Sequence, residues 1–416
     1  MPNQLDFAIQ YVEIFLFLMS HRISLARLTV SRRFSASSVR VVQSSILVDG
    51  VRSNDPSPSG RSSSSGDPIF VRLSSEISKL SVSLSPTDAQ LEEKDAFLNR
   101  LQRTVKPIID GAVVSPFGSA MNGFWSPNSD IDVCIQAPGY RTRTAQIQTL
   151  RRVAGILHPI TSHFIEPRFG AKVPIIRWAP RRPGFLACDI SINNSLAVIN
   201  SRLVGTYCMV DPRMRTLGMV IKYWAQSRGI NDRSRGTLSS FSLLLMLINF
   251  LQKRSPPILP SVQDLALELN EPLVYCDGVD VRFVSNMTAV LEELDRIAPV
   301  RNAEPTGYLL AEFFRFYGYE YKEGVIGIRD LRFFQSAERS GYLVVDNPFE
   351  VGKDVATVNS SQYGRIRQEF RRAHSLLLAG GLDQVCSRDQ PPPPMTARRG
   401  ASHPLDPPTE SLGRTR

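Results

Sequence analysis

The stretch Phe117–Ile135 reads FGSAMNGFWSPNSDIDVCI, and the rest of the chain is interpreted outward from it. An apolar run precedes it and an alternating run ends it, which predicts a strand, a glycine-containing turn, a loop and a second strand. Asp130 and Asp132 flank Ile131 at the start of the second strand. Because side chains alternate faces along a strand, both carboxylates are expected on one face of a sheet.

Two carboxylates at this spacing repel each other unless cations lie between them. Oxygen ligands favour Mg²⁺ or Mn²⁺ chelated by phosphates. Gly118 allows close approach of a phosphate to the backbone, and Ser119 adds a hydroxyl donor beside it. The pattern indicates a metal-dependent site for nucleotidyl transfer. The alternative is a solvated strand end, because a lone Asp-x-Asp is common in turns.

A third carboxylate decides between these alternatives. Residues 185–192 read FLACDISI, an apolar strand interrupted only by Asp189. A charge inside such a strand is costly unless it is paired or binds a metal. Asp189 is therefore predicted to be the third metal ligand.

Length and composition limit the remaining choices. A chain of 416 residues is expected to form two domains plus tails. Its net charge of +10 favours a polyanionic partner. The five cysteines show no paired spacing, so neither a zinc site nor a disulfide framework is indicated.

The N-terminal residues suggest a targeting segment. The apolar run at 7–18 is too short for a transmembrane helix, so no membrane association is expected. Residues 19–47 contain five Arg, many Ser and no acid, which is typical of a mitochondrial transit peptide; a disordered basic tail in a cytoplasmic protein is the alternative. Met19 is a natural alternative to Met1 as the start. We assign 1–66 to transit peptide and linker, and 379–416 to a disordered tail.

Helical patterns surround the predicted strands. Thr87 and Gln90 form a capping-box pattern that starts a helix over 88–106, and apolar periodicity predicts further helices from 196 onward. We expect a catalytic domain over 111–203 and a helical domain built from 86–110 and 204–378. Helix 88–106 is expected to pack on that helical domain. The aromatic residues within 305–322 are expected in a helical core.

Several motifs together resemble one family. The chain is similar to the DNA polymerase β-like nucleotidyltransferases, in the branch of noncanonical poly(A) polymerases and terminal uridylyltransferases, over about residues 88–378. The motifs that carry the resemblance are Gly118-Ser119, Asp130-Ile-Asp132, Cys188–Asn194 (CDISINN), Lys222–Ala225 (KYWA), Arg228–Asn231 (RGIN), Gly236–Ser240 (GTLSS), Asn347–Glu350 (NPFE) and Arg365–Phe370 (RIRQEF). With the transit-peptide pattern, the chain resembles the compact mitochondrial uridylyltransferases of trypanosomatids.

The resemblance implies a fold and a set of site residues. It implies an α/β plus α, bilobed fold, in which a mixed-sheet nucleotidyltransferase domain faces a helical poly(A)-polymerase-associated domain. Asp130, Asp132 and Asp189 would be catalytic and would hold two Mg²⁺ or Mn²⁺ ions. The nucleotide-binding residues it implies are Gly118, Ser119, Asn200, Ser201, Lys222, Gln226, Ser240, Phe241, Asn347, Glu350 and Lys353.

Some positions depart from the family pattern. Gln226 replaces a second lysine of the phosphate site, and Phe241 replaces a stacking tyrosine. Asn347 stands where an aspartate is usual, although Asp346 is adjacent. Lys353 stands where fission-yeast-type uridylyltransferases carry a histidine that excludes ATP. Because an ammonium can donate to O4 of uracil, Lys353 favours UTP.

The sequence therefore predicts an RNA uridylyltransferase that adds UMP from UTP to RNA 3′ ends without a template. We expect it to act in mitochondrial RNA processing or editing, with UTP, an RNA 3′ end and an RNA-processing complex as partners. A mitochondrial noncanonical poly(A) polymerase is the first alternative. A catalytically inactive RNA-binding or scaffold subunit is the second.

Overall fold

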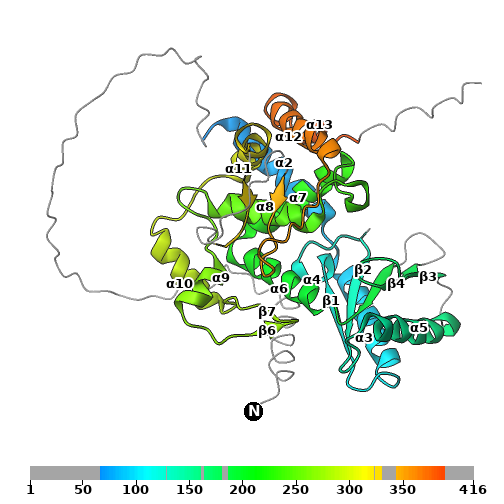
Figure 1. Cartoon of the computed structure of the whole chain (residues 1–416). Helices are drawn as coiled ribbons and strands as arrows, with labels where there is room; N and C mark the ends of the chain where they lie inside the picture. Colours follow the sequence, from blue (N-terminus) through cyan, green and yellow to red (C-terminus); the bar gives the residue numbers. More distant parts are fainter. Residues whose placement is uncertain are drawn as a thin grey trace, which may run out of the picture. The chain divides into compact units, whose positions relative to one another are not determined.

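A five-stranded mixed sheet carries the predicted carboxylates (Figure 1). Strands β2 and β5 are parallel, and the other neighbours in the sheet are antiparallel. This arrangement confirms the predicted mixed-sheet domain. In spatial order the strands are β1 (Val113–Phe117), β2 (Ile131–Gln136), β5 (Cys188–Ile192), β4 (Ile175–Ala179) and β3 (Phe164–Arg168).

The computed structural model describes residues 66–127, 129–160, 164–179, 186–322, 324–329 and 343–388. The predicted transit peptide, nearly all of the linker and residues 389–416 lie outside this range. Within it the ordered chain continues past the predicted end at 378, because α12 runs to Gly380 and a short helix, α13 (Leu382–Val385), follows.

Alternation along the strands gives the sheet two different faces. Ile131, Val133 and Ile135 of β2 are completely buried, and the corresponding side chains of β5 join them in one apolar cluster. This face packs against α3 (Asp88–Val105) and α5 (Arg143–Ile160). The opposite face carries the charged side chains of Asp132 and Asp189.

Helix α3 corrects one prediction. Its capping box at Thr87 and Gln90 is confirmed. Its buried residues, Phe97, Leu101 and Val105, belong to the cluster under the sheet, so α3 packs on the catalytic domain and not on the helical one. The prediction was wrong because periodicity shows which face of a helix is apolar but not which partner covers it.

The helix that does pack on the helical domain precedes α3. Helix α2 (Pro68–Leu84) was not predicted, because its serine-rich sequence follows the linker without a break in composition. It begins at Asp67, whose side chain accepts a hydrogen bond from the Ile69 N–H, and it contacts α7, α11 and α13. A Cβ at Gly307 would lie 2.4 Å from the carbonyl oxygen of Phe70, so glycine permits the close approach of α11 to α2.

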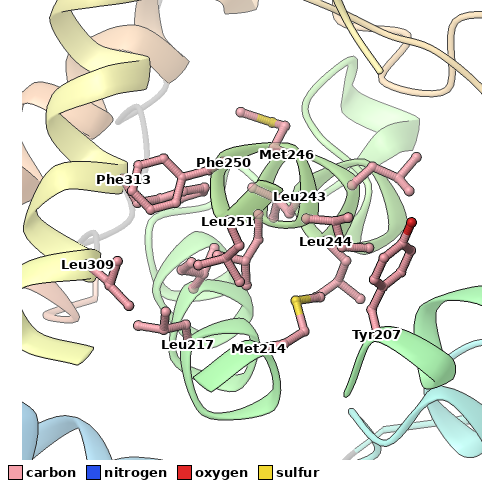
Figure 2. Packing of buried hydrophobic residues seen from close by; sticks show 14 of the residues in the cluster. Tyr207, Met214, Leu217, Leu243, Leu244, Met246, Phe250, Leu251, Leu309 and Phe313 are labelled. Atoms are coloured by element: carbon pink, nitrogen blue, oxygen red, sulfur yellow. The ribbon is translucent and has the colours of Figure 1, made fainter. Parts of the chain in front are cut away.

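The helical domain is organised around α8 (Ser240–Gln252). Every residue of α8 from 242 to 251 is buried, which is typical of a helix surrounded by others. Figure 2 shows its side chains packed between Met214 and Leu217 of α7 and Leu309 and Phe313 of α11. The surrounding helices are α6 (Ser195–Val210), α7 (Pro212–Ser227), α9 (Val262–Glu268), α10 (Met287–Ile297), α11 (Thr306–Arg315) and α12 (Ser360–Gly380).

The aromatic run of residues 305–322 lies mainly in this core, as predicted. Phe313 and Phe314 are completely buried, and both rings pack against Phe370 of α12. These residues are therefore not available to stack on bases. Within the described residues, no helix combines the length and the hydropathy that a membrane span requires.

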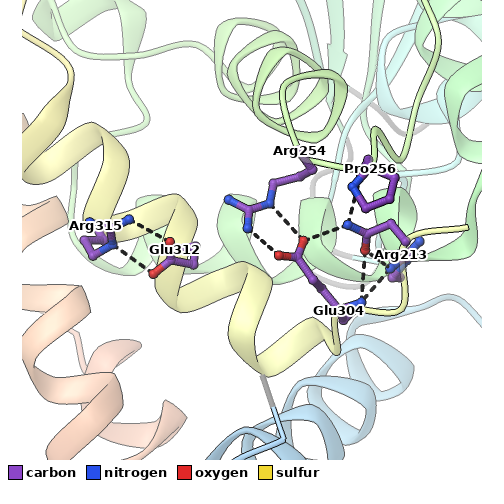
Figure 3. Close-up of polar contacts among 7 residues, drawn as sticks. Arg213, Arg254, Pro256, Glu304, Glu312 and Arg315 are labelled. Atoms are coloured by element: carbon purple, nitrogen blue, oxygen red, sulfur yellow. Dashed lines mark hydrogen bonds and ion pairs between the residues drawn. The ribbon is translucent and has the colours of Figure 1, made fainter. Parts of the chain in front are cut away.

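Several charged side chains between the helices form ion pairs. Figure 3 shows Glu304 accepting hydrogen bonds from Arg254, and Arg213 donating to the Glu304 carbonyl at 3.0 Å. Arg228, the residue that follows α7, and Glu369 of α12 form a bidentate pair with distances of 2.8 and 3.1 Å, although both residues are buried. Removing one partner of such a pair leaves a buried charge uncompensated.

Candidate active site

The register of the strands places five side chains in one row across the charged face of the sheet. Asp132 pairs with Asp189 on the parallel neighbour β5, and Asp189 pairs with Arg177 on β4. Phe117 on β1 and Glu166 on β3 complete the row at its two ends. Since registered partners project to the same face, the predicted placement of Asp132 and Asp189 on one side is confirmed.

Asp132 lies at the centre of the negative charge. Burial, together with the nearby Asp189 and Asp130 carboxylates, raises the pKa of its carboxyl to about 7. Lys222 and Arg177 act in the opposite direction but do not cancel the effect. Burial also raises the pKa of Asp189, against the influence of Arg177. The protein therefore holds carboxylates together in a place where their ionisation is unfavourable.

The residues fit a divalent cation. One oxygen of Asp189, Oδ1, is buried and has no hydrogen-bond partner among the described residues. An oxygen-only donor set is the type that Mg²⁺ and Mn²⁺ prefer. Within the described residues, no three His, Cys, Asp or Glu side chains are already grouped around one point as metal ligands. The predicted convergence of all three carboxylates on shared metal ions is therefore not confirmed.

Arg177 lies between the carboxylates, and the sequence did not predict this. Its Nη2 donates to Oδ2 of Asp130 at 2.7 Å, and its Nη1 lies 4.0 Å from Oδ1 of Asp189. The nearest indication in the sequence was a charged residue between Ile176 and Trp178, both of which are buried. That alternation places Arg177 on the polar face, but only the register shows that it faces Asp189.

The backbone at Gly118 is closely approached by a carboxylate, and its predicted contact with a phosphate stays a prediction. It adopts φ +60°, and a Cβ built on it would lie 2.5 Å from Oδ2 of Asp132. Any larger residue would therefore displace Asp132. Ser119 follows as the first residue of the short helix α4 (Ser119–Asn122) and is half-buried.

Side chains from α3, α6 and α7 donate to or accept from the backbone of the loop over residues 118–124. Lys94 of α3 donates to the carbonyl of Ala120 at 3.3 Å. Arg215 of α7 donates to the carbonyl of Gly123 at 3.0 Å. The sequence did not predict Lys94 or Arg215, because each acts on the backbone across a long sequence interval. The loop is thus fixed before any ligand binds.

Ser201 and Lys222 also bind this loop. The hydroxyl of Ser201 accepts from the Gly118 N–H at 2.7 Å and donates to the Ala197 carbonyl at 2.7 Å. Its single proton already forms a hydrogen bond with the Ala197 carbonyl, so the hydroxyl cannot donate to a nucleotide in this arrangement, as the implied nucleotide-binding role would require. Lys222 donates to the Phe124 carbonyl at 3.1 Å, which leaves two ammonium protons for phosphate.

The other residues predicted to contact the nucleotide range from buried to exposed. Oδ1 of Asn200 is buried without a hydrogen-bond partner among the described residues, so it can accept from a ribose hydroxyl. Phe241 is half-buried in the first turn of α8, where it packs against the helical core. Ser240 donates to Oδ1 of Asn231 at 3.0 Å. Gln226 is exposed on α7.

The segment 347–353 forms a turn whose polar groups bind one another. Oδ1 of Asn347 accepts from the N–H groups of Phe349 and Glu350 at 3.0 and 3.1 Å, and its amide donates to Glu350 at 3.0 Å. The Lys353 ammonium pairs with the same Glu350 carboxylate. Asp346 accepts from the Gly352 N–H at 2.7 Å and so stabilises the turn. Glu350 and Lys353 thus present an acceptor beside a donor.

Comparison with known proteins gives one consistent result. Residues 73–209 match the family described as "Poly(A) RNA polymerase, mitochondrial-like, central palm domain". The chain is 34% identical over 332 residues to poly(A) RNA polymerase cid13 of Schizosaccharomyces pombe, which covers 76% of the chain and 55% of that protein. It is 32% identical over 279 residues to human terminal uridylyltransferase 7, covering 65% of the chain and 18% of that protein.

A solved structure of a cytoplasmic RNA terminal U-transferase extends the similarity to the fold. Its TM-score is 0.67 at 27% identity, and the match covers 78% of this chain and 99% of that one. The curated relatives are longer, since the chain spans about half of the length of cid13 and less than a fifth of the uridylyltransferase. Both the helical domain and the sheet domain are therefore shared with these proteins.

Proposed function

Because the chain belongs to the polymerase β-like nucleotidyltransferases, in the branch of noncanonical poly(A) polymerases and terminal uridylyltransferases, we propose that it adds uridylyl residues from UTP to RNA 3′ ends without a template. The observation that carries this proposal is the pair of registered carboxylates, Asp132 and Asp189, with Asp130 on the same face. An inactive scaffold has no physical need to keep these mutually repelling groups.

The carboxylates and Lys222 each have a role in the proposed reaction. Asp130, Asp132 and Asp189 would hold Mg²⁺ or Mn²⁺, which supplies charge stabilisation at the α-phosphate when bound. Oδ1 of Asp189, which has no hydrogen-bond partner among the described residues, accepts the proton of the RNA 3′-hydroxyl. The 3′-oxygen then forms a bond to the α-phosphorus of the nucleotide, and the bond from that phosphorus to pyrophosphate breaks. Lys222 binds the leaving phosphates with its remaining donors.

The nucleoside binds between helix α8 and the turn 347–353. Phe241 stacks on the base, and Asn200 accepts from a ribose hydroxyl. Glu350 and Lys353 together select the base. Glu350 accepts from N3–H of uracil, and Lys353 donates to O4. Adenine presents an acceptor and an amino group on its corresponding edge, so both contacts would be mispaired. Each buried polar group left unpaired costs about 1–3 kcal/mol.

We place this activity in mitochondria. The support is the arginine- and serine-rich, acid-free segment 19–47, which has the composition of a transit peptide. The localisation is tested by expressing the full chain with a C-terminal fluorescent tag beside a chain that lacks residues 1–47. Mitochondrial fluorescence of the first chain alone supports the proposal, and a diffuse cytoplasmic signal for both contradicts it.

The base choice is tested with purified protein, a short 3′-hydroxyl RNA, Mn²⁺ or Mg²⁺ and each nucleoside triphosphate separately. We expect UTP to be incorporated in preference to ATP, and Glu350→Ala and Lys353→Ala each to narrow the difference. Glu320→Ala is the control, since Glu320 is an exposed carboxylate that pairs with Arg315 in the helical domain. Preferred incorporation of ATP by the wild-type protein would favour the poly(A) polymerase, the activity named for cid13.

A further inference from the structure

One cation of the charged row has no role in the mechanism above. Arg177 is only partly exposed, with 28% of its side chain accessible, and its guanidinium contacts two of the three carboxylates that would hold metal. The contact with Asp130 is a charge-assisted hydrogen bond of 2.7 Å, and that with Asp189 is an ion pair at 4.0 Å. A planar guanidinium with five donors can bridge two carboxylates in this way.

The position of Arg177 is fixed by the sheet. It is the registered partner of Asp189 on the antiparallel neighbour β4, while Ile176 and Trp178 beside it are buried on the opposite face. Its backbone therefore cannot turn away from the carboxylates. Only its side chain can leave them. Two further cations act on the group: Lys222 acts on Asp132 from helix α7, and Arg168 of β3 acts on Asp189.

We propose that Arg177 is a positioning residue that serves as an internal counter-ion for Asp130 and Asp189, and that it competes with divalent cations for their oxygens. This inference rests on the proposed metal-dependent function. The oxygen of Asp130 that binds Arg177 cannot offer the same lone pairs to a metal. The guanidinium must therefore leave Oδ2 of Asp130 when a metal ion takes the same lone pairs, and the positive charge near Asp189 weakens metal binding in addition.

The consequence is that the carboxylates stay partly neutralised until metal arrives together with a nucleotide. Three carboxylates without a cation between them repel one another, and this repulsion lowers the stability of the folded protein. Arg177 reduces this repulsion. A metal ion that arrives alone must displace the arginine, whereas one chelated by a triphosphate brings additional contacts that offset the loss.

The test measures Mn²⁺ binding directly, in the full chain and without nucleotide, from the electron paramagnetic resonance signal of free Mn²⁺. We expect Arg177→Gln to bind Mn²⁺ roughly tenfold more tightly than the wild type, because one positive charge leaves the site. Arg177→Lys should give a smaller gain, since an ammonium keeps the charge but not the bridging geometry. Asp132→Asn should weaken the binding, which identifies the carboxylates as the site.

Arg168→Gln is the matched control. Arg168 lies two residues from Glu166 on β3, and it binds Glu166 through Nε at 3.1 Å and Nη2 at 3.0 Å. The variant therefore removes a positive charge from the same sheet that acts on Asp189 and Asp130 without a direct bond, whereas Arg177 contacts both. We expect its Mn²⁺ affinity to stay within about twofold of the wild type.

Thermal unfolding gives an independent readout. In EDTA, Arg177→Gln should melt below the wild type, and saturating Mn²⁺ should remove most of the difference. If the glutamine variant does not fold in EDTA, the lysine variant decides by its Mn²⁺ affinity. Unchanged or weaker Mn²⁺ binding by folded Arg177 variants would overturn the inference. Metal-dependent labelling of RNA by the wild type, measured in parallel, shows separately whether the proposed function stands.

Discussion

The buried charges of the helical domain and those of the sheet are treated in opposite ways. In the helical domain Arg228 and Glu369 satisfy each other through two hydrogen bonds, and Arg254 and Glu304 do the same. In the sheet Asp132 and Asp189 stand side by side with raised pKa values, and one oxygen of Asp189 has no hydrogen-bond partner among the described residues. The first arrangement is complete within the protein, whereas the second becomes favourable only with a ligand.

This difference predicts opposite effects of removing a charge. A carboxylate taken from the helical domain leaves an arginine without its partner. A carboxylate taken from the sheet relieves repulsion but removes chemistry. Stability and activity should therefore separate between the two regions, and four substitutions test this from the largest expected effect to the smallest.

Asp189→Ala should lower nucleotidyl transfer by roughly 10³-fold or more, because an electrostatic group at the reacting centre is lost. Its melting temperature without divalent cations should stay equal to that of the wild type or rise, since a carboxylate that repels Asp132 is gone. Transfer is measured by extension of a labelled RNA, and melting by circular dichroism. Wild-type activity would show that Asp189 is only structural.

Glu369→Ala should lower the free energy of unfolding by about 3–5 kcal/mol, because buried Arg228 loses its partner. Urea unfolding measures the loss. Asp295→Ala is the control, since Asp295 pairs with Arg301 at the surface and such pairs contribute about 0–1 kcal/mol. Similar losses for the two variants would mean that burial does not distinguish these pairs.

Gly118→Ala should reduce transfer by roughly 10²-fold, because the new Cβ would displace the Asp132 carboxylate from its working position. Gly123→Ala is matched to it: Gly123 also has a positive φ, of +88°, but a Cβ there would meet nothing within 4 Å. Both variants should lose about 1–3 kcal/mol of stability from backbone strain, Gly118→Ala more than Gly123→Ala, because the Gly118 backbone lies outside the left-handed region. If both lose activity equally, strain in the loop and not contact with Asp132 is responsible.

Ser201→Ala should lower the free energy of unfolding by about 1 kcal/mol and raise the KM for nucleotide, because the Gly118 N–H loses its acceptor. Ser201→Thr keeps a hydroxyl and should behave like the wild type. Thr206→Val serves for comparison, since the buried Thr206 hydroxyl donates only to a carbonyl of its own helix. An equal rise in KM for Thr206→Val would mean that helix α6, and not the link to Gly118, is responsible.

The sequence predicted the local features of this site well. Alternation along a strand places Asp130 and Asp132 on one face, and an isolated charge in an apolar strand identifies Asp189. The strands and the helical core follow from apolar periodicity. Each of these inferences depends on residues only a few positions apart.

The features that were missed depend on pairing across long intervals. Arg177 faces Asp189 because β4 and β5 are neighbours in a particular register, which no local pattern specifies. Helix α3 was assigned to the wrong partner for the same reason, since its apolar face fits either domain. The contacts of Ser201 and Lys94 with the glycine loop also arise only after the chain has folded.

Helix α2 has a consequence for how the protein is made. Its Ser74 hydroxyl accepts from the Gly307 N–H, a residue 233 positions later in the chain. At about 5–20 residues per second, a ribosome needs roughly 10–50 seconds to synthesise that interval. During this time Phe70, Leu73 and Ile77 have no partner from α11, while the sheet domain between them can already fold. The α11-facing residues of α2 therefore stay exposed on the nascent chain, where molecular chaperones can bind them until synthesis reaches α11.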